Sequence, residues 1–167
     1  MLAGLLMILT GCVTMDEAYD AINWKSIVLV AGMLPMATAL ETVGLVTVAA
    51  ELLTDSVGVL SPYAVLAVLF LATSLFTQVI SNTATTVIIA PVALAAAQTL
   101  GIAPYAFLMG VAIAASMAFA SPVASPVNTL VMGAGNYRFG DYLRIGLPLI
   151  VLMLVLAVFF LPLLFPF

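Results

Sequence analysis

The chain has 167 residues, of which 66% are hydrophobic and 6% are charged. Because a soluble domain carries about 25% charged residues, this composition excludes an ordinary soluble fold and indicates an all-α polytopic membrane protein. The net charge of −4 includes only three basic residues, which excludes the basic surface of a nucleic-acid-binding protein. With no histidine and a single cysteine, Cys12, disulfides and Cys/His metal sites within the chain are excluded too.

The first 14 residues form a short apolar run. Leu9-Thr10-Gly11-Cys12 is similar to a bacterial lipoprotein cleavage box, but such a signal begins with basic residues, and the first one here is Lys25. Fourteen residues are also too few to span a bilayer. We therefore interpret residues 1–14 as the end of a truncated helix in a fragment of a longer chain, and 14–23 as a loop or short surface helix.

A first membrane span is predicted over residues 24–43. Asn23 can cap its start, and Trp24 and Lys25 are typical anchors at the membrane interface. Residues 45–55 are too few to cross the bilayer and are acidic toward their end, so they predict an interfacial helix that lies along the membrane surface.

Residues 62–100 predict a helical hairpin. From Tyr63 to Leu100 no residue is charged, and the polar run Ser81-Asn82-Thr83 is the clear interruption. Because Ser81 and Asn82 are helix-capping residues, one helix is expected to end near Ile80 and another to start at Thr83, with almost no loop between them. Two full spans are usually joined by a longer, more polar turn, which favours a re-entrant hairpin with a buried tip. A polar turn between two ordinary spans is the alternative.

The tip of such a hairpin is suited to binding ions. The first helix ends there, and its unpaired carbonyl groups favour a cation. The second helix begins there, and its free amides favour an anion. Transporters use broken helices of this kind to hold substrate and coupling ion near the middle of the membrane.

Residues 104–135 predict a broken transmembrane helix. A helix rich in small residues, which permit close packing against another helix, is expected from Tyr105 to Ala120. Pro122 and Pro126 then remove two amide donors and cannot both lie in one regular helix. A simple proline kink is the alternative, but a second polar break in so short a chain favours a binding site. Residues 144–167 follow as the last span, after a polar loop.

The three basic residues predict the orientation. With the hairpin entering and leaving on one side, Lys25, Arg138 and Arg144 all lie on the opposite side of the membrane. The positive-inside rule makes that side cytoplasmic. Two full crossings give the same sidedness, so this pattern leaves the choice between the two arrangements open.

At these residues the chain resembles the C-terminal half of the divalent anion/sodium symporter family, within the wider ion transporter superfamily. The resemblance covers essentially the whole chain. It rests on the Ser81-Asn82-Thr83-Ala84 hairpin and on the break at Ser121-Pro122-Val123-Ala124-Ser125-Pro126-Val127-Asn128. The family has two inverted repeats, each with such a hairpin and a broken helix, and one of the two repeats is present here.

The resemblance implies a sodium-coupled symporter for small divalent anions, such as dicarboxylates or sulfate, that works by alternating access. It implies one sodium ion bound by Thr77, the carbonyl of Ile80, Asn82 and the carbonyl of Ala124. It implies contacts with the dianionic substrate from Ser81, Asn82, Thr83, Ser125 and Pro126. It further implies a homodimer in the lipid bilayer of the inner membrane of a bacterium or archaeon, with an N-terminal repeat half that completes the pocket.

Two other functions remain open from the sequence. A proton-coupled antiporter, or an exporter of arsenite or another anion, is the alternative within the superfamily. Proton coupling usually requires an ionisable residue inside the membrane, and the acids nearest a predicted span, Glu41 and Glu51, lie at a helix end and on the surface helix. The other alternative is a membrane fragment that does not transport. An enzyme is not favoured, because the sequence shows no nucleophile–base pair.

Overall fold

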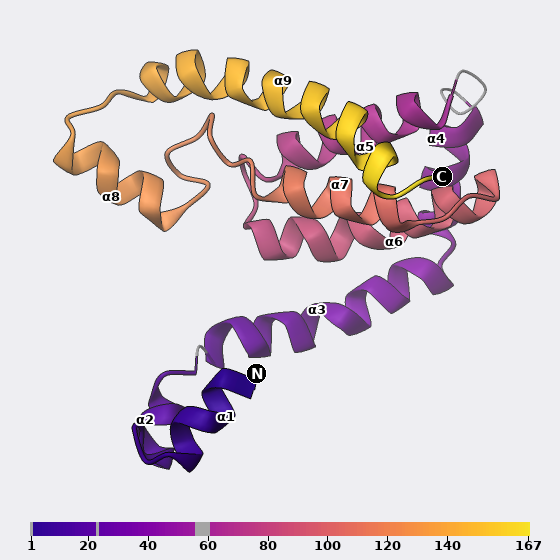
Figure 1. Cartoon of the computed structure of the whole chain (residues 1–167). Helices are drawn as coiled ribbons and strands as arrows, with labels where there is room; N and C mark the ends of the chain where they lie inside the picture. Colours follow the sequence, from indigo (N-terminus) through magenta and orange to yellow (C-terminus); the bar gives the residue numbers. More distant parts are fainter. Residues whose placement is uncertain (1, 23, 56–60) are drawn as a thin grey trace. The chain divides into compact units, whose positions relative to one another are not determined.

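The computed structural model describes residues 2–22, 24–55 and 61–167 (Figure 1). The regular elements within these ranges are helices, with no strand, as the sequence predicts. The chain divides into two compact units, Met1–Gly32 and Met33–Phe167. Asn23, which we expected to cap a helix, and most of the turn before residue 62 lie outside the described residues.

The first unit contains α1 (Leu2–Leu9), α2 (Met15–Asp20) and the start of α3 (Trp24–Thr42). α2 is the short helix that was one of the two interpretations of residues 14–23. Thr14 and Glu17 cap its start, since the Glu17 amide donates to the Thr14 hydroxyl over 3.3 Å and the Thr14 amide donates to the Glu17 carboxylate over 2.9 Å. Hydrogen bonds from the backbone amide and then the hydroxyl of Thr14 lower the pKa of Glu17.

The second unit continues α3 and contains six more helices among the described residues. These are α4 (Leu45–Leu53), α5 (Pro62–Phe76), α6 (Asn82–Leu100), α7 (Tyr105–Ala115), α8 (Pro126–Ala134) and α9 (Phe139–Leu164). Ser61 caps α5, with Pro62 in its first turn, and Gly101 ends α6 at a φ of 68°, a left-handed conformation that favours glycine. Only residues 77–81 separate α5 from α6, as expected for a helical hairpin.

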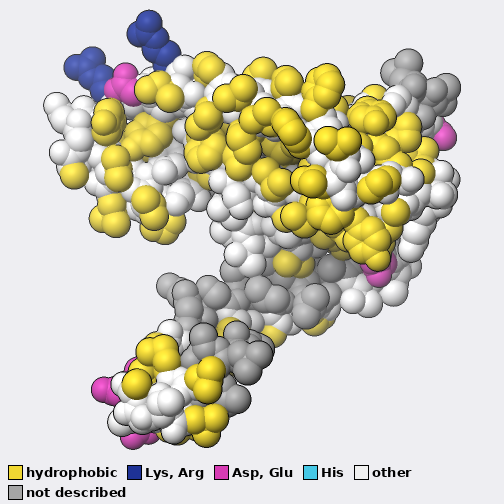
Figure 2. Space-filling view, in the orientation of Figure 1, with side chains coloured by type: hydrophobic (Ala, Val, Ile, Leu, Met, Phe, Trp, Pro, Cys, Tyr) yellow, Lys and Arg dark blue, Asp and Glu magenta, His cyan; other side chains and the backbone are white. Residues whose placement is uncertain are grey.

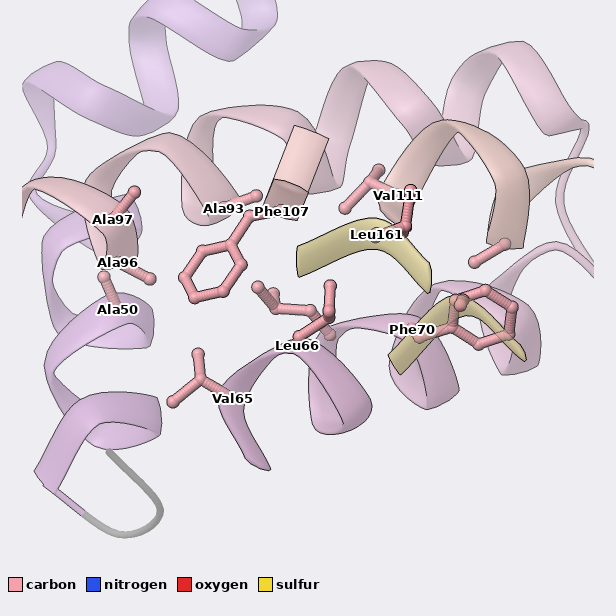
Figure 3. Packing of buried hydrophobic residues seen from close by; sticks show 13 residues of the cluster. Ala50, Val65, Leu66, Phe70, Ala93, Ala96, Ala97, Phe107, Val111 and Leu161 are labelled. Carbon is pink, nitrogen blue, oxygen red and sulfur yellow. The ribbon is translucent and has the colours of Figure 1, made fainter. Parts of the chain in front are cut away.

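A hydrophobic core joins α5, α6, α7 and α9. Phe107 on α7 and Val65 and Leu66 on α5 point toward one another, while Ala96 and Ala97 of α6 lie near Ala50 of α4 (Figure 3). All of these side chains are buried. The alanines of α6 and α7 are small enough for helix backbones to approach closely, which confirms the expected packing role of the small residues after Tyr105.

Gly110 is a point of close approach between α7 and α5. A Cβ atom added at this glycine would lie 2.7 Å from Cδ1 of Leu66. The neighbouring atom is the end of a flexible side chain, so the contact is close but adjustable.

The surface of the second unit is largely apolar. Figure 2 shows hydrophobic side chains over much of the visible face, and α9 alone exposes several large ones, including Val151, Leu152, Phe159 and Phe160. Among the described residues, α6 and α9 are the helices long and apolar enough to cross a membrane. The basic side chains Arg138 and Arg144 are exposed where α9 begins.

Three helix ends differ from the sequence-based expectations. α5 ends at Phe76 rather than near Ile80, and the amides of Val79 and Ile80 both turn back to the Phe76 carbonyl. α7 ends at Ala115 rather than Ala120, where side chains of the turn after α5 bind the carbonyls of Ala115 and Met117. α9 starts at Phe139, before the expected start at residue 144, because the Asp141 carboxylate accepts a hydrogen bond of 2.8 Å from the amide of Arg138 and so caps the first turn.

Candidate ion and substrate site

The turn between α5 and α6, residues 77–81, forms the tip of the hairpin. The amides of Val79 and Ile80 both donate to the carbonyl of Phe76, which closes the end of α5. Ser81 is the N-cap of α6, and its hydroxyl accepts a hydrogen bond of 3.3 Å from the amide of Ala84. The sequence-based expectation that Asn82 is a second cap is wrong, since Asn82 is the first residue of α6 and its side chain contacts Thr77, just after α5, instead.

Three oxygen atoms meet at the tip. The Thr77 hydroxyl lies 2.6 Å from the carbonyl oxygen of Ala115, at the end of α7, and 2.9 Å from Oδ1 of Asn82. The Thr77 hydroxyl is the donor in both contacts, and its single proton serves one of the two acceptors at a time. Thr77 Oγ1, Asn82 Oδ1 and the Ala115 carbonyl therefore form a group of neutral oxygen atoms. Thr77 is fully buried, and a buried group of neutral oxygens is suited to a small cation.

Gln78, the next residue, binds the segment after α7. Its Nε2 donates over 2.8 Å to the carbonyl of Ser74 and over 2.8 Å to that of Met117. Its Oε1 accepts a hydrogen bond of 3.0 Å from the amide of Ala120. We did not select Gln78 from the sequence. The signal that could have identified Gln78 is its amide side chain, which has two donors to satisfy and lies within an apolar run.

Residues 116–125 form the break between α7 and α8, where backbone carbonyls are left without helical partners. Asn128 Nδ2 donates to the carbonyls of Ala118 and Ser121 over 2.7 and 3.1 Å. The Thr129 hydroxyl donates to the carbonyl of Pro122 over 2.7 Å. Side chains at the start of α8 therefore stabilise the break, a role that we did not assign to Asn128 or Thr129 from the sequence.

The free backbone amides at the tip lie at the start of α6. The amides of Asn82 and Thr83 have no hydrogen-bond partner in the part of the chain that the structure describes. Ser81 and Thr83 are exposed, so solvent or a ligand can reach them. This end of α6 carries the positive end of the helix dipole and is suited to an anion.

The remaining predicted site residues lie at the far end of the break. Ser125 is the N-cap of α8, and its side chain makes no capping hydrogen bond. Pro126 begins α8, and Ala124 comes just before it. The hydrogen bonds that join the break to the tip involve Ala115, Met117 and Ala120. The roles of Ala124, Ser125 and Pro126, and of the Ile80 carbonyl, stay predictions.

Two more hydroxyls lie one helical turn from the tip. Ser74 and Thr85 are buried, and neither hydroxyl has a hydrogen-bond partner within the described structure. They come three residues before Thr77 and three after Asn82, so they occupy matching positions on the two arms of the hairpin. A buried hydroxyl without a protein partner is typical of a place where water or an ion binds.

The start of α9 contacts the break directly. A Cβ atom added at Gly146 would lie 2.5 Å from the carbonyl oxygen of Phe119 and 2.7 Å from Cα of Ala120. The Tyr142 hydroxyl, one turn earlier, donates over 2.8 Å to the carbonyl of Asn128. A cavity of about 330 Å³ lies beside these contacts, lined by Phe119, Asn128, Val131, Tyr137, Asp141, Tyr142, Ile145, Gly146 and Leu149.

Comparison with known proteins identifies the class to which this arrangement belongs. The uncharacterized transporter YfbS of Escherichia coli (strain K12) is 47% identical over 99% of this chain and 27% of its own length. Sodium/sulfate cotransporter 2 of Chlamydomonas reinhardtii is 30% identical over 96% of this chain and 18% of its own length. The Na(+)/citrate cotransporter of Mus musculus is 30% identical over 78% of this chain and 23% of its own length. These relatives are transporters, and the chain spans less than a third of their length.

A family model for citrate transporters, CitMHS, matches residues 1–107. The chain belongs to this citrate transporter family, together with relatives named as sodium/sulfate and Na(+)/citrate cotransporters. The resemblance to divalent anion/sodium symporters that the two breaks indicated is confirmed, and the family is one of transporters rather than enzymes.

Proposed function

We propose that this chain forms one repeat half of a sodium-coupled symporter for small divalent anions, such as sulfate or dicarboxylates. In this proposal the α5–α6 hairpin is re-entrant, and its tip holds the coupling ion and the substrate near the middle of the membrane. An inverted N-terminal half supplies the second sodium site and the rest of the pocket. The complete transporter is a homodimer in the inner membrane and works by alternating access.

The observation that carries the proposal is the meeting of Thr77, Asn82 and Ala115 at the tip. Neutral oxygens replace the hydration shell of a sodium ion, and Thr77 Oγ1, Asn82 Oδ1 and the Ala115 carbonyl bring three of them together. The carbonyls of Ile80 and Ala124 complete the predicted set. The names of the cotransporter relatives favour sodium as the ion.

The anion side of the proposal is supported by the other helix ends. The free amides of Asn82 and Thr83 and the hydroxyl of Ser81 lie at the start of α6, and Ser125 and Pro126 lie at the start of α8. Two helix N-termini with short polar side chains provide donors for a dianion without a basic residue. Sulfate and citrate, which appear in the names of relatives, are the first substrates to test.

Uptake into proteoliposomes tests the proposed function. The experiment uses a transporter of the relatives' length that contains this segment, which we call the full-length transporter. We expect labelled sulfate, succinate or citrate to accumulate with an inward sodium gradient and not with a choline gradient. The 167-residue chain by itself should give no sodium-dependent uptake, because the proposed pocket also requires the N-terminal half. Equal uptake in sodium and in choline, or robust transport by the short chain, would contradict the proposal.

Replacing Asn82 with Ala in the full-length transporter removes an ion ligand and the contact with Thr77. A hydrogen bond of this kind contributes about 1 kcal/mol, so we expect at least a roughly fivefold loss of apparent sodium affinity. Substrate affinity should fall with it, because linked ligands affect each other reciprocally. The measurement is the sodium dependence of labelled substrate binding. Glu51→Gln, on α4, is the control and should change little; an unaltered sodium dependence in Asn82→Ala would place the ion elsewhere.

A further inference from the structure

Gln78 has an unusual position in the hairpin. Both ends of its amide are used: Nε2 donates to the carbonyls of Ser74 and Met117, and Oε1 accepts from the amide of Ala120. Two of these partners belong to the break between α7 and α8, and one belongs to the last turn of α5. A single side chain therefore fixes the break against the end of α5.

The neighbours of Gln78 connect the two parts of the candidate site. Thr77, next to it in the chain, contacts Asn82 at the tip. On the other side, Met117 and Ala120 lie in the segment that leads to Ser125 and Pro126. An ion that fixes Thr77 also fixes the backbone from which the Gln78 side chain extends. The hydrogen bonds of Gln78 thus link the backbone of the tip to the backbone of the break.

We propose that Gln78 is a positioning residue that couples sodium binding at the tip to substrate binding at the break. The inference rests on the function proposed above. Gln78 contacts neither ligand in this account, and its amide transmits the ordering of one segment to the other. Coupling between two sites requires a structural element whose position both ligands bias. The three hydrogen bonds of the Gln78 side chain form such an element.

The role is distinct from simple stabilisation of the fold. A residue that only stabilises the fold changes the amount of folded protein, but it does not change the ratio of sodium affinities measured with and without substrate. That ratio is the coupling factor, and by linkage it equals the ratio of substrate affinities at high and low sodium. The coupling factor is therefore the readout that separates the two roles.

The test uses the full-length transporter in nanodiscs, with labelled sulfate, succinate and citrate measured in turn over a range of sodium concentrations. Gln78→Ala removes all three hydrogen bonds, and Gln78→Met keeps an unbranched side chain of similar length without them. Gln98→Ala is the matched control, because Gln98 lies near the far end of α6 and its side chain makes no hydrogen bond within the described structure. Thermal unfolding of each variant monitors the fold.

We expect both Gln78 variants to lower the coupling factor about tenfold, within the usual range for coupled sites, and to leave sodium affinity without substrate close to that of the unaltered transporter. Gln98→Ala should keep the full coupling factor. An unchanged factor in the Gln78 variants, or loss of folded protein in both of them, would overturn the inference while the proposed function stands. Substrate binding without any sodium dependence in the unaltered transporter would overturn both.

Discussion

Replacing Thr77 with Val in the full-length transporter is expected to lower apparent sodium affinity tenfold or more. Valine has the shape of threonine but no hydroxyl, so the change removes an ion ligand and leaves the carbonyl of Ala115 buried without a donor. A polar contact with a charged group contributes about 1.5–3 kcal/mol, and 1.4 kcal/mol corresponds to a factor of about ten in affinity. The unpaired Ala115 carbonyl lowers the stability of the fold in addition. The measurement is sodium-dependent binding of labelled substrate.

Thr73→Val is the matched control for this prediction. Thr73 is also fully buried on α5, one turn before Thr77, but its hydroxyl donates over 2.6 Å to the carbonyl of Leu69 in its own helix. Thr73→Val should therefore leave sodium affinity nearly unchanged, and Thr77→Ser, which keeps the hydroxyl, should retain most of it. Equal sodium affinities in Thr77→Val and Thr73→Val would show that Thr77 is a structural residue.

The second large effect is expected at Gly146, where α9 meets the break. In Gly146→Ala the added Cβ atom meets the backbone of Phe119 and Ala120, which cannot move aside as a side chain can. We expect a loss of stability of about 2–3 kcal/mol, in the upper part of the range for overpacking. Substrate affinity should fall too, because the displaced segment leads to Ser125 and Pro126.

Gly110→Ala provides the comparison for Gly146→Ala. Its Cβ atom also makes a contact shorter than 3 Å, but the neighbour is the terminal methyl group of Leu66, which can rotate. A gain in helix propensity of up to about 1 kcal/mol offsets the strain, so thermal unfolding of this variant should be close to normal. If the two alanine variants unfold at the same temperature and bind substrate equally, the direct contact of α9 with the break has no functional role.

The hairpin could be predicted from the sequence because its signal is local. A polar tripeptide within a long uncharged run contains the turn, and the capping preference of Ser81 determines where α6 begins. The family resemblance followed from the pairing of this motif with the proline-containing break. These features depend on residues that are close together in the chain, so sequence reasoning could identify them.

The interactions between the two motifs could not be predicted in this way. α5 ends early because Thr77 and Gln78 find partners in Ala115, Met117 and Ala120, about forty residues further on. One of these contacts lies at the end of α7, since the carbonyl of its last residue, Ala115, accepts a hydrogen bond from the Thr77 hydroxyl. An apolar sequence pattern with a period of 3.6 residues carries no information about such pairings, and tertiary contacts determine them.

The most direct test of the account is a cryo-electron microscopy structure of the full-length transporter in lipid nanodiscs, with sodium and a bound substrate anion. The account predicts that the tip of the α5–α6 hairpin lies buried at mid-depth in the bilayer. It also predicts density for an ion within contact of Thr77 Oγ1 and Asn82 Oδ1, absent when choline replaces sodium. A structure in which Asn82 lies at the membrane surface, or in which the sodium density is elsewhere, would contradict it.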